Sequence, residues 1–424
     1  MKLDSIALHH GYEAESTTKA AAVPIYQTTS YTFDNTQHGA DLFDLKVPGN
    51  IYTRIMNPTT AVLEERLAAM EGGIGALAVA SGMAAITYAI QCLCEVGDNI
   101  VSTSQLYGGT YNLFAHTFPR QGIEARMVSH DDYSSFEAQI DDRTRALFCE
   151  SIGNPAGNIV DIERLAEIAH RHGVPLIVDN TVATPYLCRA FEYGADIIVH
   201  SLTKYIGGHG TSVGGVIIDS GKFDWVKNKA RFGVFSEPDA SYHGVVYSEA
   251  FGPAAYIGRC RVVPLRNTGA AISPQNAFQI LQGLETLGLR MDRHCENALA
   301  LANYLRQHRK VTWVNYAALD DSPYLGNCQK ICDGRASGIL SFGIKGGAQA
   351  GATFIDALQM ILRLVNIGDA KSLACHPAST THRQLSSNEL ASAGVSEDLV
   401  RISVGIEHID DIISDVEQAL NTVS

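Results

Sequence analysis

The sequence contains few charged residues, and acidic residues outnumber basic ones. Asp, Glu, Lys and Arg make up 18% of the 424 residues, below the usual share of about 25%. The 32 Lys and Arg against 45 Asp and Glu give a formal net charge of −13. Because binding to a phosphate backbone needs a basic surface, nucleic acid is not an expected partner. Hydrophobic residues make up 46%, which excludes intrinsic disorder and predicts a large buried core.

The sequence also lacks an apolar leader and a paired set of metal-binding cysteines. The start, MKLDSIALHH, has no apolar stretch of signal-peptide length. The nine cysteines are scattered from Cys92 to Cys375, and no two pairs stand at the spacing of a zinc ribbon. We therefore expect a cytoplasmic protein with reduced thiols and no metal centre.

One uncharged stretch, residues 74–94, is long enough to raise the question of a membrane span. Its sequence, IGALAVASGMAAITYAIQCLC, is rich in Ala and Gly and contains polar residues. It divides better into a buried strand (Ala76–Ala80), a turn that begins at Ser81 and a buried helix. We therefore expect no transmembrane segment.

Short apolar runs alternate with helical patterns through much of the chain. Helices are expected from Pro58 to the glycines at 72–73 and over Asp161–His172. The expected strands are Ala76–Ala80, Ile100–Ser102, Ala125–Val128, Ala146–Cys149, Leu176–Val178, Ile197–Val199 and Val216–Ile218. This alternation predicts an α/β fold with a mostly parallel sheet. In such a sheet, ligands bind beyond the carboxyl ends of the strands.

Three regions depart from this pattern and suggest the domain organisation. Residues 1–60 are polar and irregular, so we expect them to lie on the main domain or on a neighbouring subunit. Residues 222–273 are also irregular, and a long helical pattern follows from Pro274 to about His308. The remainder mixes two strand-like runs, GILSFGI and LVRISVGI, with helices, as expected of a smaller α+β domain. The predicted divisions are an N-terminal segment (1–60), a large domain (61–273), and a bridging helix with a smaller domain (274–424).

Reactive residues follow several of the expected strands. Asp179 ends the run PLIVD, where a helix N-cap is the plain structural alternative. Ser201, Thr203 and Lys204 follow the next run and precede glycines that could cradle a phosphate. A lysine with a lowered pKa is the nucleophile that forms Schiff bases. A lysine for the aldehyde, a carboxylate for the ring nitrogen and donors for the phosphate together fit pyridoxal phosphate.

Six motifs of the sequence resemble those of a known family. The motifs that carry the resemblance are VASGMAA, QLYGGTY, ESIGNP, VDNT, HSLTKYIGGH and RISVGIE. They resemble, in order and across the chain, the cysteine/methionine-metabolism group of pyridoxal phosphate enzymes. The resemblance implies the aspartate-aminotransferase-like fold (fold type I), and a tetramer built from two active dimers.

The resemblance also implies roles for individual residues. Lys204 would be the Schiff-base lysine and general base, and Asp179 would pair with the ring nitrogen. Tyr107 would stack on the ring and assist proton transfer. Arg401 would bind the substrate carboxylate. The phosphate would be held by Ser201, Thr203, Gly82 and Met83, with Tyr52 and Arg54 reaching the neighbouring subunit's phosphate, and Asn154 and Ser372 would assist Arg401.

The choice of reaction rests on finer features. Methionine γ-lyases carry a cysteine where this chain has Gly109. The segments ISPQNAFQILQGLETLGLRMDRHCENAL and GDAKSLACHPASTTHRQL resemble the ester sulfhydrylases of the group. We therefore expect γ-replacement on O-acetyl-L-homoserine by sulfide or a thiol. The alternatives are cystathionine γ-synthase or γ-lyase activity, and O-succinylhomoserine as the ester. A non-enzymatic scaffold would be expected to lack Lys204 or Asp179, and both are present.

Overall fold

Residues 75–219 form a seven-stranded sheet in the computed structural model, which describes residues 1–377, 380 and 396–423. The strands are β1 (Gly75–Val79), β2 (Asn99–Thr103), β3 (Glu124–Val128), β4 (Thr144–Glu150), β5 (Leu176–Asp179), β6 (Ile197–Ser201) and β7 (Gly215–Asp219). Their spatial order is β1-β7-β6-β5-β4-β2-β3. Strands β2 to β6 pair in parallel, and β7 runs antiparallel to β1 and β6. The predicted α/β fold with a mostly parallel sheet is confirmed.

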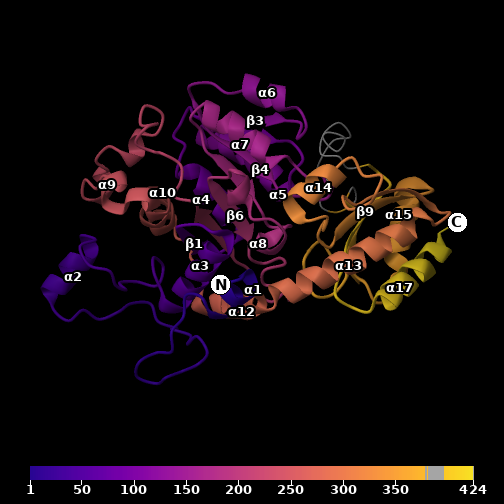
Figure 1. The fold of residues 1–424 in the computed structure, drawn as a ribbon, viewed down its shortest axis with the longest axis horizontal. Helices are drawn as coiled ribbons and strands as arrows, with labels where there is room; N and C mark the ends of the chain where they lie inside the picture. The colour runs from indigo at the N-terminus through magenta and orange to yellow at the C-terminus, as the bar shows by residue number, and fades with distance from the viewer. Residues whose placement is uncertain (378–379, 381–395, 424) are drawn as a thin grey trace.

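Helices cover this sheet, as the amphipathic and apolar patterns predict (Figure 1). The uncharged stretch at 74–94 forms β1 and then α4 (Gly82–Gln91), with the Ser81 side chain accepting from the backbone N–H of Ala84 as the N-cap. In the described part of the chain, no helix combines the length and apolarity that crossing a bilayer requires. The other helices around this sheet are α3 (Pro58–Glu71), α5 (Gly108–Asn112), α6 (Tyr133–Ala138), α7 (Ile162–Arg171) and α8 (Thr184–Leu187).

The N-terminal segment is less irregular than expected. It contains α1 (Leu3–His9) and α2 (Thr36–Phe43), and α2 projects away from the body of the molecule (Figure 1). The two helices have only seven and eight residues, too few to show a sustained period in the sequence. Several large apolar side chains in this segment are at least 36% exposed, namely Ile25, Tyr26, Phe33, Phe43, Val47 and Tyr52.

Two other regions also differ from expectation. Residues 222–273 are largely helical and contain α9 (Tyr247–Phe251), α10 (Ala255–Cys260) and α11 (Arg266–Thr268). These helices are too short to show a clear period. The single helix expected from Pro274 to His308 is two helices, α12 (Pro274–Glu285) and α13 (Leu287–Arg306), which meet at Thr286.

A second sheet of five strands lies in the C-terminal part (Figure 1). Its strands are β8 (Val311–Asn315), β9 (Ile339–Ile344), β10 (Leu362–Arg363), β11 (Leu373–Cys375) and β12 (Leu399–Ser403), in the order β10-β11-β12-β9-β8. Helices α14 (Leu325–Cys332), α15 (Gly347–Ala357) and α17 (Ile409–Thr422) accompany it. The sequence predicts β9 and β12, which are buried throughout. It does not predict β8, β10 and β11, which are only partly buried or two to three residues long.

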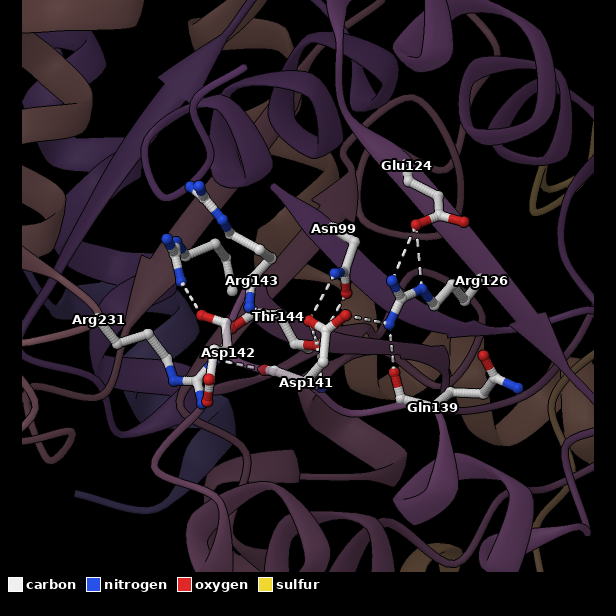
Figure 2. A network of polar contacts seen from close by, with 10 residues as sticks. Asn99, Glu124, Arg126, Gln139, Asp141, Asp142, Arg143, Thr144 and Arg231 are labelled. Atoms are coloured by element: carbon white, nitrogen blue, oxygen red, sulfur yellow. Dashed lines mark hydrogen bonds and ion pairs between the residues drawn. The ribbon is translucent and has the colours of Figure 1, made fainter. Parts of the chain in front are cut away.

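The amino ends of three parallel strands are joined by a polar network (Figure 2). The carboxylate of Asp141 accepts from Asn99 Nδ2 and from the backbone N–H of Arg143, each at 2.8 Å, and pairs with Arg126 at 2.8 Å. Arg126 also pairs with Glu124 at 3.0 Å. Asn99 and Glu124 begin β2 and β3, so the network fixes the starts of these strands beside the turn before β4.

Candidate active site

The opposite, carboxyl ends of the strands surround a cavity of about 210 Å³. This is the edge at which parallel α/β sheets bind ligands. Its lining includes eight of the predicted site residues: Gly82, Met83, Tyr107, Asn154, Asp179, Ser201, Thr203 and Lys204. Residues from the C-terminal part, Val365 and Ile367, complete one wall. The cavity therefore lies where both sheets contribute.

Lys204 contributes a positive charge to the lining of this cavity. It sits in a turn directly after β6, and its Nζ donates to Oδ1 of Asn366 at 2.5 Å. Burial and the nearby positive charge of Arg401 lower the pKa of Lys204 to about 8. A larger fraction of the amine is therefore unprotonated near neutral pH than for an exposed lysine. The sequence did not indicate Asn366, because it lies 162 residues away, between β10 and β11 of the second sheet.

Asp179 ends β5 and faces the same cavity. Its Oδ1 accepts from the backbone N–H of Thr181 at 3.0 Å and from the Thr181 hydroxyl at 2.5 Å. Burial raises the pKa of Asp179, and the two hydrogen bonds from Thr181 oppose this shift. Since both bonds go to Oδ1, the other carboxylate oxygen remains available to a ligand in the cavity. A cationic ring nitrogen there would favour the ionised carboxylate.

The start of α4 forms a second wall with donors for an anion. The first intrahelical bond runs from Ala85 N to Ser81 O, so the amides of Gly82 and Met83 precede it. Free amides and the helix dipole favour an anion at this position. A Cβ on Gly82 would lie 2.6 Å from the Cβ of Ser201. Only glycine therefore lets the helix start approach the end of β6, where the Ser201 hydroxyl joins the same wall.

Tyr107 and Asn154 are joined by a buried carboxylate that the sequence analysis missed. Glu150, 5% exposed at the end of β4, accepts from the backbone N–H of Tyr107 at 2.6 Å and of Asn154 at 3.3 Å. Burial and the neighbouring Asp179 raise the pKa of Glu150. An acidic residue at the end of a buried strand is the signal that identified Asp179, and it applied equally here.

Arg401 approaches the cavity from β12. Its guanidinium donates to Asn154 Oδ1 at 3.0 Å and to the carbonyl oxygen of Asn366 at 3.1 Å. Arg401 is 4% exposed, and its Nε is buried without a hydrogen-bond partner. Within the described ranges, no carboxylate pairs with it. A buried guanidinium is costly without an anion, so the arrangement fits a substrate carboxylate.

Four predicted site residues are not in the lining of the cavity, namely Arg401, which approaches it from β12, and Ser372, Arg54 and Tyr52. Ser372 is fully buried, and its hydroxyl contacts Glu407 and the amide of Gly405. Arg54 donates to the carbonyl oxygen of Arg266, and its guanidinium lies 5.5 Å from the ring centre of Tyr52. The contact of Ser372 with substrate, and of Tyr52 and Arg54 with a neighbouring subunit, stay predictions. Most of the HPASTTH segment lies outside the described residues.

The residues present fit pyridoxal phosphate. Lys204 offers an amine of lowered pKa, Asp179 an available carboxylate oxygen, and the start of α4 offers amides for a phosphate. Because Gly82 has no side chain, the start of α4 can lie close to Ser201, and both can face the same phosphate. Thr203 also lines the cavity, and its hydroxyl contacts the backbone of Gly214.

Comparison with known proteins also points to a pyridoxal phosphate enzyme. Residues 4–421 match the family described as Cys/Met metabolism PLP-dependent enzyme. A homocysteine synthase of Schizosaccharomyces pombe is 52% identical over 418 residues, covering 98% of this chain and 97% of its own. An O-acetyl-L-homoserine sulfhydrylase of Leptospira meyeri is 51% identical over 431 residues, covering 100% and 97%.

A solved structure agrees in fold over nearly the full length. It is a Campylobacter jejuni protein described as an O-acetylhomoserine (thiol)-lyase with a pyridoxyl-lysine phosphate, 44% identical, with a TM-score of 0.97. The match covers 99% of this chain and 100% of that one. The chain belongs to the Cys/Met metabolism family of PLP-dependent enzymes, and pyridoxal phosphate is its cofactor.

Proposed function

We propose that the protein is an O-acetylhomoserine sulfhydrylase, which replaces the acetate of O-acetyl-L-homoserine by sulfide or a thiol to give homocysteine or methionine. The observation that carries this proposal is a cavity lined by Lys204 and Asp179, with Arg401 bonded to Asn154 of its wall. The chain is also about half identical to relatives of that name. Bound pyridoxal phosphate supplies an electron sink for the charge left when an amino acid loses its Cα proton.

In this proposal Lys204 moves the protons. As a free amine, its Nζ has a lowered pKa that suits proton transfer near neutral pH. The Nζ takes the Cα proton, and removal of a Cβ proton then lets acetate leave from Cγ. A sulfur nucleophile adds at Cγ, and the protons return in the reverse order. Asn366 accepts a hydrogen bond from Nζ and so orients the amine.

Arg401 and Asn154 are proposed to bind the substrate. The guanidinium can offer two parallel N–H groups to the α-carboxylate, and Asn154 Oδ1 holds its Nη1 in place. Glu150 holds the backbones of Tyr107 and Asn154 and thereby fixes both sides of the substrate's path. Tyr107, 44% exposed on the cavity wall, is placed to cover the ring and to assist departure of acetate.

The proposal includes an oligomer with shared sites. Lys204 is the only cation among the described residues that line the cavity. Arginine forms strong, frequently bidentate pairs with phosphate, so an arginine from another subunit would complete the phosphate site. Tyr52 and Arg54 lie in a segment with exposed apolar side chains, which a second subunit could cover. We infer a tetramer of two active dimers in which Arg54 reaches the neighbour's phosphate.

The domain division and the location belong to the same proposal. The two sheets fall on either side of residue 273, which supports a large domain at 61–273 and a smaller one at 274–424. The nine free, buried cysteines support a cytoplasmic location, where thiols stay reduced.

Product analysis tests the reaction. Purified holoenzyme should convert O-acetyl-L-homoserine and sulfide to homocysteine faster than it uses O-succinyl-L-homoserine, and faster than it breaks down cystathionine or methionine. Lys204→Ala is the matched control and should not turn over. Faster cleavage of cystathionine or methionine would contradict the proposal and leave the family assignment intact.

A further inference from the structure

Helix α13 carries three buried polar residues on one face. Arg290, His294 and Asn297 are 5%, 0% and 4% exposed. Their spacing of four and three residues places them on the same side of the helix. Figure 1 shows α13 running from the region of the large sheet to the small sheet. This polar face can therefore contact both parts of the molecule.

Arg290 holds the turn that carries Lys204. Its guanidinium donates to the carbonyl oxygens of Tyr205 at 2.6 Å and Ile206 at 3.3 Å, the two residues after the lysine, and to Gly283 at 2.6 Å. Among the described residues no carboxylate pairs with it, and burial lowers its pKa to about 10. The guanidinium is thus buried against backbone carbonyls of the lysine turn and of α12.

Glycines make this contact possible. A Cβ on Gly208 would overlap Nη1 of Arg290, and a Cβ on Gly283 would overlap the carbonyl oxygen of Gly207. Gly208 also has a φ of +72°, which glycine adopts readily. The lysine turn and the junction of α12 with α13 therefore touch through backbone atoms, with the guanidinium filling the space between them.

His294 and Asn297 hold the turn that follows β12, the strand that carries Arg401. Nδ1 of His294 lies 2.6 Å from the carbonyl oxygen of Val404. A carbonyl only accepts, so Nδ1 carries the proton. Nδ2 of Asn297 donates to the carbonyl oxygens of Gly405 at 3.0 Å and Glu407 at 2.9 Å. Three carbonyl groups of one turn are thus fixed to α13.

We propose that Arg290, His294 and Asn297 are positioning residues that set the placement of Lys204 relative to Arg401. They do not line the cavity and act through the two turns that they hold. The Cα proton must meet Lys204 while the carboxylate stays on Arg401, and a misplacement of about 1 Å can cost roughly 100-fold in rate. The inference rests on the proposed roles of Lys204 and Arg401.

Glycine binding to the holoenzyme tests whether His294 and Asn297 set the position of Arg401. Glycine has the α-carboxylate that Arg401 would bind and no leaving group, so its affinity is read from the change in the cofactor's absorption. Asn297→Ala should weaken glycine binding by roughly 5- to 30-fold, the effect of one or two lost hydrogen bonds. The absorption spectrum without glycine should stay that of the unchanged protein.

His294 gives a second, independent variant for this side. His294→Leu should weaken glycine binding in the same way as Asn297→Ala. His294→Asn keeps an N–H donor near the position of Nδ1 and should restore much of the affinity. Equal loss in both His294 variants would overturn the role assigned to this hydrogen bond.

Arg290→Lys tests the Lys204 side. The lysine keeps the positive charge but cannot reach three carbonyl groups at once. Arg290→Lys should shift the pH midpoint of the cofactor's absorption by about half a unit or more. This midpoint reports the protonation of the bond between Lys204 and the cofactor. The substitution should lower kcat more than it raises the KM of the amino acid. Should Arg290→Lys not fold, Arg290→Gln serves as the same test.

Arg293→Ala and Asn303→Ala are the matched controls on the same helix. The Arg293 side chain is 53% exposed and pairs with Glu296, and Asn303 Nδ2 contacts the carbonyl oxygen of Leu299 within the helix. Both controls should match the unchanged protein. The proposal is overturned if they lose glycine affinity as Asn297→Ala does, or if Asn297→Ala binds glycine normally. A holoenzyme that binds glycine but does not use O-acetyl-L-homoserine would instead contradict the proposed reaction.

Discussion

Lys204 differs from most lysines in that it is partly buried beside another cation. Burial and Arg401 both lower its pKa, to about 8, and its hydrogen bond goes to the neutral amide of Asn366. At pH 7 about one in ten such amines is unprotonated, against roughly one in 2,500 for a lysine of ordinary pKa. The residue is therefore ready to react with an aldehyde near neutral pH.

This shift predicts the pH dependence of cofactor uptake. After apoenzyme is mixed with pyridoxal phosphate, the rate of formation of the bound absorption band should rise with pH through a midpoint near 8. Arg401→Met removes a positive charge near Lys204, so the midpoint should move to higher pH. Lys204→Ala is the control and should not form the band. A midpoint near 10 in the unchanged protein would contradict the assignment of a perturbed lysine.

Gly109 offers a second test at the scale of one residue. A Cβ at this position would lie 2.5 Å from Cε1 of Tyr107. In Gly109→Ala the exposed Tyr107 ring can move away, so the free energy of unfolding should change by only about 0.5 kcal/mol. Turnover should fall about tenfold, because the ring no longer covers the cavity in the same place.

A matched substitution separates placement of the ring from a general effect of alanine. Gly326→Ala adds a methyl group that meets nothing within 4 Å, and it should leave kcat and stability unchanged. If Gly109→Ala also keeps normal kcat and KM, then the position of the Tyr107 ring does not matter for turnover.

The strands show why one end of the sheet is reactive and the other is structural. At the amino ends, Asp141 is paired with Arg126 and accepts from Asn99 and Arg143, so its charge is balanced (Figure 2). At the carboxyl ends, Asp179 keeps a carboxylate oxygen available. The same residue type therefore ties strands together at one end and can bind a ligand at the other.

The Asp141 network predicts a contribution to stability with a defined pH range. Hydrogen bonds from Asn99 and Arg126 outweigh burial and hold the pKa of Asp141 below its usual range. A depressed pKa stabilises the folded state above the unfolded-state pKa of about 3.9, and the contribution is lost as pH falls through the folded-state value. Asp141→Asn should therefore lower the free energy of unfolding by about 1 kcal/mol at pH 7.

Urea denaturation across pH checks this prediction. The difference between the unchanged protein and Asp141→Asn should be constant from pH 7 to pH 5 and should shrink below about pH 4. Asp142→Asn is the neighbouring control, because the side chain of Asp142 accepts no hydrogen bond from Asn99. A difference that already disappears between pH 7 and pH 5 would show that the Asp141 carboxylate is not the responsible group.

At the scale of elements, burial decided what the sequence could predict. All seven strands of the large sheet were predicted, six of them from buried apolar runs. The exception is the edge strand β3, in which only Val128 is buried. The helices α1 and α2 were missed because few of their residues are buried. The break at Thr286 was missed because α12 must bring Gly283 against Gly207, a contact that no local pattern records.

At the scale of the whole molecule, the N-terminal segment is marked by large apolar side chains that its own chain leaves exposed. Its helix α2 extends from the body (Figure 1), and the exposed side chains include Phe33 and Phe43. In monomeric proteins such side chains rarely gather in one exposed segment. This supports the proposed shared site, in which a second subunit covers the segment and receives Arg54.

Mixed oligomers test the shared site. Arg54→Ala and Lys204→Ala homo-oligomers should each be nearly inactive. A dimer with one subunit of each kind contains one site in which both residues are intact, so random mixing should restore about a quarter of the activity. Oligomers reassembled from either variant alone are the control. Absence of recovery in verified mixed oligomers would show that Arg54 does not act across the subunit boundary.

The sequence by itself determined the family, the cofactor and the residues at the strand ends, because these depend on local order along the chain. Lys204, Asp179 and Ser201 each stand directly after an apolar run, and parallel strands bring such positions to one edge. The tertiary structure alone decided which residues from distant segments meet them. Asn366 reaches Lys204, Glu150 joins Tyr107 to Asn154, and one face of α13 fixes both turns. The contacts of Asn366 and of α13 depend on how the two sheets are held against each other, and the contact of Glu150 depends on how the loops after β2 and β4 fold together. No local pattern of residues encodes either arrangement.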